Sequence, residues 1–212
     1  MKPFEELLEA SVAQHGHLCA GQVIGVRMAM LGCRLVGIED PKSPEYRKKL
    51  IVYVEIDRCA TDAIESVTGC RMGKRTLKFK DFGINAATFV NLETQEAYRI
   101  ISTESSRETC KQFAPDQTDP KKRQILGYSK MPDELLFEVQ KVKVDLPGTD
   151  MPGPPKSHAQ CNRCGQMVRD GKERRIDNQI LCRHCAGEGY YHLMENHHIN
   201  YEHDQASKET NL

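Results

Sequence analysis

Four cysteines in the C-terminal part of the chain constrain its fold more than any other feature. They form two pairs, Cys161 with Cys164 and Cys182 with Cys185, with two residues inside each pair and 17 residues between the pairs. This spacing is typical of zinc sites. Four thiolates complete a tetrahedral shell and leave no position for water, so the spacing predicts a structural zinc ion. A module of this size has little apolar core, and metal binding supplies its folding energy.

A segment rich in proline and glycine separates this module from the rest of the chain. Residues 147–158 contain four prolines and two glycines, a composition that disfavours helix and strand. We therefore predict a core domain over 1–146, a linker over 147–158, and a zinc finger with a His-rich C-terminal helix or tail over 159–212. Short hairpin strands between the cysteine pairs and a helix over 186–198 would make the finger a treble clef.

A second group of potential metal ligands lies near the N-terminus. His15, His17 and Cys19 are spaced two residues apart, so their side chains would point to one side of an extended segment. Residues 21–35 are apolar at nearly every position and predict a buried helix. The N-terminal end of a helix favours a thiolate, so we expect Cys19 to be reactive or bound to a metal. The alternative is that all three are ordinary structural residues.

Further cysteines follow the next predicted strand. Residues 50–56 predict a buried strand, central in its sheet, that leads into Cys59, and a short helix over 60–67 leads to a turn that contains Cys70 and Lys74. Ends of strands that precede helices often carry functional residues. The turn is not a P-loop, because three residues rather than four separate its glycines and no Ser or Thr follows the lysine.

The remaining pattern completes an α+β core, a mixed or antiparallel sheet packed with helices. An amphipathic helix over 4–12 precedes the His/Cys run. Strands are predicted over 77–82, 87–92 and 97–102, the last two as an antiparallel hairpin. Residues 104–130 predict two helical pieces divided at Pro115 and Pro120, and 135–146 contain a last strand.

The composition excludes several classes of protein. The chain has 30 basic and 30 acidic residues, so its net charge gives no argument for bulk binding to nucleic acid or membranes. Arg27 and Arg34 interrupt the most apolar run, 23–36, which is too short to span a bilayer. Nine cysteines, four of them in a metal pattern, favour a reducing compartment over a disulfide framework. We expect a cytoplasmic protein without a membrane segment or a secretory signal.

Three motifs in order resemble those of a known family. They are HGHLCAG at residues 15–21, DRCATDAI at 57–64 and TGCRMGK at 68–74. Together they resemble the family named after the E subunit of formylmethanofuran dehydrogenase, over roughly residues 4–145, and a C-terminal zinc finger is appended in members of that family. One departure is Ala20, where the family pattern usually has proline.

The resemblance implies the location of a site more clearly than its purpose. It implies an α+β core, a dimer, and a metal-binding or active-site cleft lined by His and Cys residues. Carried over residue by residue, it places His17, Cys19 and Cys59 at the cleft, with Cys70 and Lys74 nearby. The family is named for its association with a molybdenum or tungsten enzyme and does not by itself imply an activity.

Three functions remain open from the sequence. The first is an accessory or catalytic subunit in one-carbon metabolism, partnered with a molybdenum or tungsten oxidoreductase, with a second metal, expected to be zinc, in the cleft. The second is a module that binds protein or nucleic acid through the mildly basic finger, although nucleic-acid contact has weak support. The third is a thiol redox sensor that uses Cys19 with Cys59 or Cys70. We also expect a homodimer, because the linker permits exchange of the finger between protomers.

Overall fold

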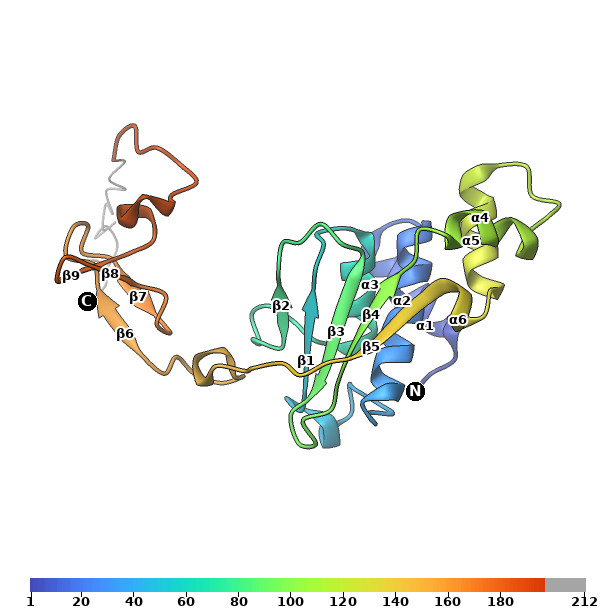
Figure 1. Cartoon of the computed structure of the whole chain (residues 1–212), viewed down its shortest axis with the longest axis horizontal. Coiled ribbons are helices and arrows are strands. Elements are labelled where there is room, and N and C mark those ends of the chain that lie inside the picture. Colours follow the sequence, from blue (N-terminus) through green and yellow to red (C-terminus); the bar gives the residue numbers. More distant parts are fainter. Residues whose placement is uncertain (197–212) are drawn as a thin grey trace, which may run out of the picture. The chain divides into compact units, whose positions relative to one another are not determined.

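The computed structural model of the protein describes residues 1–196 of the chain. The chain forms two compact units, Met1–Pro154 and Pro155–Leu212 (Figure 1). The division falls inside the segment 147–158 that the sequence predicts as a linker. The fold class is α+β, as predicted, with helices packed on a mixed sheet in the first unit.

The first unit is built on one sheet, which has five strands in the described part of the chain, in the order β2-β1-β3-β4-β5. Strand β1 pairs in parallel with β2, and the other neighbouring strands are antiparallel. All residues of β1 are buried, as expected of a strand with a neighbour on each side. The strands are β1 (Leu50–Val54), β2 (Leu77–Phe79), β3 (Ala86–Asn91), β4 (Ala97–Ser102) and β5 (Phe137–Lys141).

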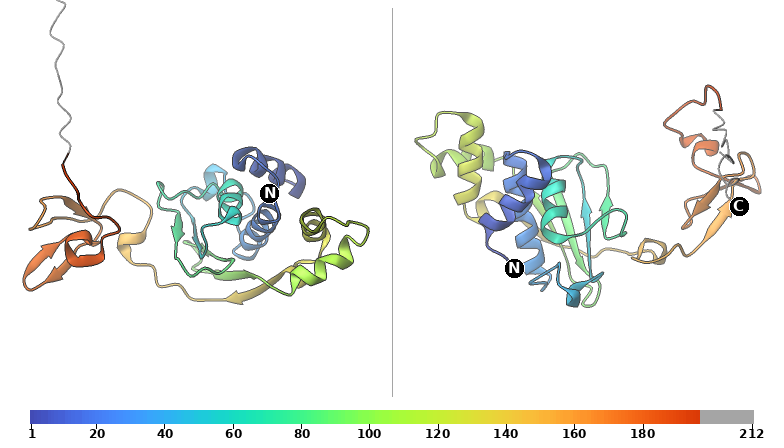
Figure 2. Two further views of the ribbon diagram at one scale, coloured as in Figure 1. Left: turned by 90° about the horizontal axis from the view of Figure 1, so that it is seen from above. Right: turned by 180° about the vertical axis from the view of Figure 1, so that it is seen from behind.

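Helices α1 (Phe4–His15), α2 (Ala20–Leu35) and α3 (Cys59–Thr68) lie together on one face of this sheet (Figure 2). Val52 and Phe89 of the sheet belong to the core that these helices cover. Alternate residues of a strand point to opposite faces, and Ile51 and Tyr53 belong to a smaller cluster on the other face. Apolar side chains of the segment after β5 pack against that second cluster.

Two further helical segments follow β4. The first predicted piece of 104–130 is not one helix but a short α4 (Ser106–Thr109) and a 3₁₀ turn η2 (Cys110–Phe113). The second piece is α5 (Pro120–Lys130), which begins at the predicted proline. Asp119 caps α5 by accepting hydrogen bonds from the backbone N–H groups of Lys121 and Lys122.

The last strand forms inside the predicted segment 135–146, after a short helix. Residues Asp133–Leu136 form α6, and β5 begins only at Phe137. Arg27 of α2 explains this arrangement, because its guanidinium donates to the carbonyl of Tyr128 at 2.6 Å and pairs with Asp133 at 2.5 Å. The start of α6 is thereby fixed to the helical layer. The other short turns of the first unit are η1 (Pro44–Tyr46) and η3 (Gly148–Asp150).

The second unit consists of two small hairpins. Strand β6 (His158–Gln160) pairs with β7 (Met167–Arg169), and β8 (Arg174–Ile176) pairs with β9 (Gln179–Leu181). A single helical turn, η4 (His184–Glu188), follows the second hairpin.

The helix predicted over 186–198 is not formed in its described part. Gly187, inside η4, has a non-helical φ of 90°, and residues 189–196 are irregular. Residues 197–212, which hold the rest of the predicted His-rich helix or tail, lie outside the described residues. A treble clef is therefore not shown.

None of the helices between residues 1 and 196 combines the length and the hydropathy needed to cross a bilayer.

Candidate metal sites

The four cysteines of the second unit lie close together. Their sulfur atoms are all within 4.8 Å of one another, and Cys164 Sγ lies 3.8 Å from Cys182 Sγ. Two sulfurs bound to one zinc ion at ~2.3 Å in a tetrahedron are ~3.8 Å apart. The cluster therefore has the dimensions of a zinc site with four thiolate ligands.

Backbone turns at the ends of the hairpins hold these cysteines in place. Cys161 accepts a hydrogen bond from the N–H of Gly165 at 2.9 Å, and Gly165 has a φ of 74°, which a residue with a side chain rarely adopts. Asn162 exchanges two hydrogen bonds with the backbone of Ile180, at 2.6 and 2.7 Å. This residue joins the first cysteine pair to β9, the strand that leads to Cys182. Asn162 was not predicted from the sequence.

The pKa values of the clustered thiols favour a bound cation. Backbone N–H groups, first that of Cys164 and then that of Cys182, lower the pKa of the Cys161 thiol to about 6. The pKa of Cys185 rises to about 12, first because of desolvation and then because of hydrogen bonds to the neighbouring thiols. Four adjacent thiols cannot all ionise without a cation, and a divalent metal removes that conflict.

The second cluster is formed where three helices of the first unit meet. His15 is the last residue of α1, Gly16 turns the chain with a φ of 95°, and Cys19 precedes the first turn of α2. One donor atom from each of His15, His17 and Cys19 lies within 4.8 Å of the other two. The two imidazole rings are 4.6 Å apart between centroids.

The two ring nitrogens of His15 have different partners. Nδ1 lies 2.8 Å from a carboxylate oxygen of Asp62, a residue in the first turn of α3. Nε2 is buried and has no hydrogen-bond partner among residues 1–196. An imidazole that bonds a carboxylate through one nitrogen and offers the other nitrogen is the usual arrangement of a metal-binding histidine. His17 is exposed, so the cluster is open to solvent on that side.

Cys59 lies next to this cluster, at the start of α3. Desolvation, and next its hydrogen bond with Cys19, raise the pKa of the Cys59 thiol. The close approach depends on Gly21 of α2, because a Cβ atom there would lie 2.8 Å from the Cβ of Cys59. Cys59 is not one of the three donors that are mutually within 4.8 Å, but it is adjacent to one of them.

A buried glutamine fixes Cys59 from the other side. Gln22 of α2 is fully buried, and its side-chain amide donates to the carbonyl of Cys59 at 2.7 Å. Its side-chain oxygen accepts from the hydroxyl of Ser11 on α1. These bonds join all three helices around the cluster. The sequence signal was a polar residue inside an otherwise apolar run, but the interpretation as a buried helix did not use it.

Cys70 and Lys74 are not brought to the cluster. They follow the C-terminal end of α3, and ten helical residues separate that end from Cys59 by about 15 Å. The Cys70 thiol is buried, and its S–H donates to the carbonyl of Leu50 at 3.7 Å. Burial raises the pKa of this thiol to about 11. The expectation that Cys70 and Lys74 lie near the cleft is therefore wrong.

Comparisons with known proteins agree with the architecture. The crystal structure of a protein from Syntrophus aciditrophicus, described as like FmdE of a tungsten formylmethanofuran dehydrogenase, has a similar fold. Its TM-score is 0.58 and its sequence identity 23%, and the match covers 89% of this chain and 94% of that one. A protein of Archaeoglobus fulgidus named a probable S-adenosyl-L-methionine-binding protein is 27% identical over 206 residues, which is 83% of this chain and 51% of that protein. The chain thus spans about half the length of this relative.

The match to a protein family covers most of the first unit. The family is described as FmdE, molybdenum formylmethanofuran dehydrogenase operon, and its model matches residues 14–145. This range includes His15, His17, Cys19 and Cys59, and it is more than half of the chain. The chain belongs to the FmdE family.

Proposed function

We propose that this FmdE-family protein binds two zinc ions with different roles. One is structural and is held by the four cysteines of the second unit. The other is held by His15, His17 and Cys19, with Cys59 as a further ligand. The observation that supports the second site best is the buried Nε2 of His15, which has no partner among the described residues while Nδ1 bonds Asp62.

The residues at the second site suit zinc better than harder or larger ions. Imidazole and thiolate ligands favour zinc over magnesium or calcium, which prefer oxygen ligands. A zinc ion there would supply Lewis acidity to a bound substrate or water. His17 is exposed, so a small molecule can reach the site without a change in the fold. His15, His17 and Cys19 alone leave one exchangeable position, the feature that separates catalytic from structural zinc sites, and binding of Cys59 would fill that position.

We further propose a role in one-carbon metabolism, as an accessory or catalytic subunit that acts with a molybdenum or tungsten oxidoreductase. The family match supports this assignment, since the family is described by its association with a molybdenum formylmethanofuran dehydrogenase operon. We also propose that the protein is a homodimer, which sedimentation of the full chain at micromolar concentration tests. A single species with the mass of one chain would contradict the dimer.

The metal content of purified protein tests the two-site proposal. The wild-type chain should contain two zinc equivalents by mass spectrometry of the metal, and the double variant Cys19→Ser/Cys59→Ser should contain one. Cys59→Ser alone shows whether Cys59 is a ligand. Cys110→Ser is a matched control, because Cys110 is a buried thiol of the same unit that lies in neither cluster. An equal metal content in the wild type and the double variant would show that the second zinc site does not exist.

The hydrogen bond between Cys19 and Cys59 supports a second candidate function, a reversible thiol pair. Mild oxidation with hydrogen peroxide would join the two sulfurs and reduce the peroxide to water, which takes up the two thiol protons. Peptide mass spectrometry of zinc-loaded protein distinguishes the two functions. If Cys19 and Cys59 resist oxidation by peroxide, the metal site is supported. If they rapidly form a disulfide, the redox pair is supported.

A further inference from the structure

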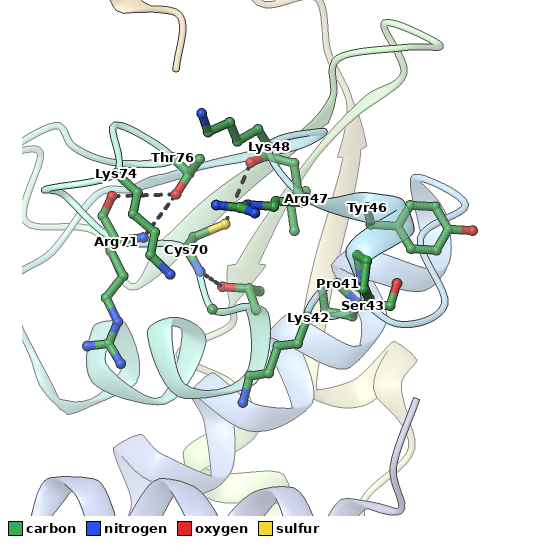
Figure 3. Close-up of a pocket in the computed structure, with 14 residues that line it drawn as sticks. Pro41, Lys42, Ser43, Tyr46, Arg47, Lys48, Cys70, Arg71, Lys74 and Thr76 are labelled. Carbon is green, nitrogen blue, oxygen red and sulfur yellow. Dashed lines mark hydrogen bonds between the residues drawn. The ribbon is translucent and has the colours of Figure 1, made fainter. Parts of the chain in front are cut away.

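A pocket of about 530 Å³ lies in the first unit, beside the C-terminal end of α3. It is formed by the segment between α2 and β1 and by the turn between α3 and β2 (Figure 3). Its volume is in the range of sites for small molecules and cofactors. The second metal cluster lies at the opposite end of α3, so the pocket is a separate feature.

The pocket is strongly cationic. Five of the residues that line it are basic and none is acidic; the basic residues are Lys42, Arg47, Lys48, Arg71 and Lys74. Within the described residues, Arg71 is the one member of this set with an ion pair, which it forms with Glu65. Figure 3 shows the side chains of Arg47 and Lys74 reaching towards Cys70 from the two different segments.

The other lining groups are also compatible with an anion. Cys70 is buried at the pocket, and its high pKa keeps the thiol neutral, so that it adds no negative charge. The hydroxyl of Ser43 is buried and has no hydrogen-bond partner among residues 1–196. An unpaired buried hydroxyl is uncommon in native structures.

Structural roles do not account for this concentration of charge. Basic residues are favoured near the C-terminal end of a helix, and this explains Arg71 and Lys74. It does not explain Arg47 and Lys48, which belong to the segment before β1. Lys48 also has a φ of 63°, a conformation that glycine or asparagine adopts at lower cost. The pKa of Lys42 is lowered, first by desolvation and then by the charges of Arg71 and Lys2, and the nearby carboxylate of Asp40 offsets this only in part.

We propose that this pocket binds a small molecule that carries a diphosphate or a comparable pair of phosphate groups. Arg47 and Lys74, which reach towards Cys70 from two segments, match phosphate oxygens in both charge and hydrogen-bond direction. More than one phosphate is expected, because a single phosphate would leave most of the five cations without a partner. The volume leaves space for an organic group attached to the phosphates.

Isothermal titration of the full chain with sodium pyrophosphate, at constant ionic strength, tests the proposal. We expect saturable binding with a dissociation constant below about 1 mM. Arg47→Gln and Lys74→Gln should each weaken binding about tenfold, which is the usual effect of removing one charge-assisted contact. Lys143→Gln is the matched control, because it removes the same charge from an exposed residue that lies outside the pocket. The affinity of this variant for pyrophosphate should equal that of the wild type.

A further measurement separates this site from other anion-binding surfaces. Pyrophosphate also coordinates zinc, so the Cys19→Ser/Cys59→Ser variant should bind it as tightly as the wild type. Loss of binding in that variant would place the anion at the metal and overturn the proposal, even if the metal site itself exists. The proposal is also wrong if Lys74→Gln binds pyrophosphate as tightly as the wild type does.

Discussion

The two ring nitrogens of His15 have different surroundings, and this difference favours a bound metal ion. A buried ring nitrogen without a partner costs free energy, and native structures rarely retain one. Here the other nitrogen is bonded to Asp62, which favours the tautomer with a free lone pair on Nε2. A metal ion at Nε2 removes the cost, whereas a purely structural role for His15 leaves it in place.

The carboxylate of Asp62 should therefore tune metal affinity rather than stability. Asp62→Asn retains the shape of the side chain but is a weaker acceptor, and zinc affinity at the second site should fall about 10- to 100-fold. Competition with a chromophoric chelator measures the change. The midpoint of thermal unfolding should stay close to that of the wild type, because Asp62 is 57% exposed and surface pairs contribute little.

Asp116→Asn is the matched control for this change, because Asp116 is exposed and lies outside the cluster. Its zinc affinity should not differ from that of the wild type. If Asp62→Asn also leaves the affinity unchanged, Asp62 does not orient a ligand.

The close contact between α2 and α3 requires that residue 25 has no Cβ atom. A Cβ atom at this position would lie 2.4 Å from the carbonyl oxygen of Ala60 and 2.7 Å from the Cβ of Ala63. Gly25→Ala should lower the free energy of unfolding by about 1–3 kcal/mol, the usual cost of overpacking. Urea denaturation measures this.

Gly73→Ala provides the opposite case in the same unit. Apart from Gly73 and its two chain neighbours, no described residue has an atom within 4 Å of a Cβ at this position. The substitution should therefore be neutral, or stabilise the protein by up to about 1 kcal/mol because alanine lowers the conformational entropy of the unfolded chain. Equal effects of the two substitutions would mean that the helix contact is not tight.

The sequence identified the donors of the second cluster but not the way in which they meet. The spacing of His15, His17 and Cys19 suggested an extended segment with alternate side chains on one side. In the structure His15 ends a helix, and Gly16 reverses the chain in a left-handed conformation. Periodicity does not specify such a turn, because it depends on one backbone angle. Asp62 and Gln22 were missed as neighbours for a related reason, since their contacts join residues 47 and 37 positions apart.

At the level of elements, Gln22 connects the helices that make the site. Gln22→Leu would leave the hydroxyl of Ser11 and the carbonyl of Cys59 without their present partner. We expect a loss of about 1–3 kcal/mol in the free energy of unfolding, because both groups lie in a poorly solvated region. Chemical denaturation measures this loss.

Gln14→Leu is the control for that substitution, because Gln14 is exposed and its hydrogen bond to Glu65 is long at 3.4 Å. It should change stability by no more than about 0.5 kcal/mol. A similarly small effect of Gln22→Leu would show that the buried network does not stabilise the helical layer.

Hydrophobic pattern predicted the larger elements and failed where the chain is short or broken by glycine. The apolar runs of 21–35 and 50–56 correspond to α2 and β1, because burial on several sides requires apolar residues at most positions. The parallel pairing of β1 with β2 has no local signal, since it depends on which segments meet in space. The prediction of a helix over 186–198 did not take account of the glycines at 187 and 189, and the left-handed Gly187 interrupts the helical geometry inside η4.

For the whole molecule, the two units differ in what stabilises them. The first unit has an extensive buried core that joins its helices to its sheet. Between residues 155 and 196, by contrast, the buried apolar side chains are Cys161 and Leu181. So little apolar burial cannot offset the conformational entropy of ordering a segment of this length. The zinc ion that we propose would therefore supply most of the folding energy of the second unit.

This difference predicts two separate unfolding events. Cys182→Ser should release one zinc equivalent and expose the amides of 158–188 to rapid hydrogen exchange, while the amides of β1, β3 and α2 keep the protection of the wild type. The core retains its protection because its buried contacts lie within residues 1–154. Cys110→Ser, which alters a buried thiol outside both clusters, should leave the zinc content and the exchange of 158–188 unchanged. If Cys182→Ser instead raises exchange in the core to the same extent, the two units fold as one, and the zinc ion of the second unit stabilises the whole chain.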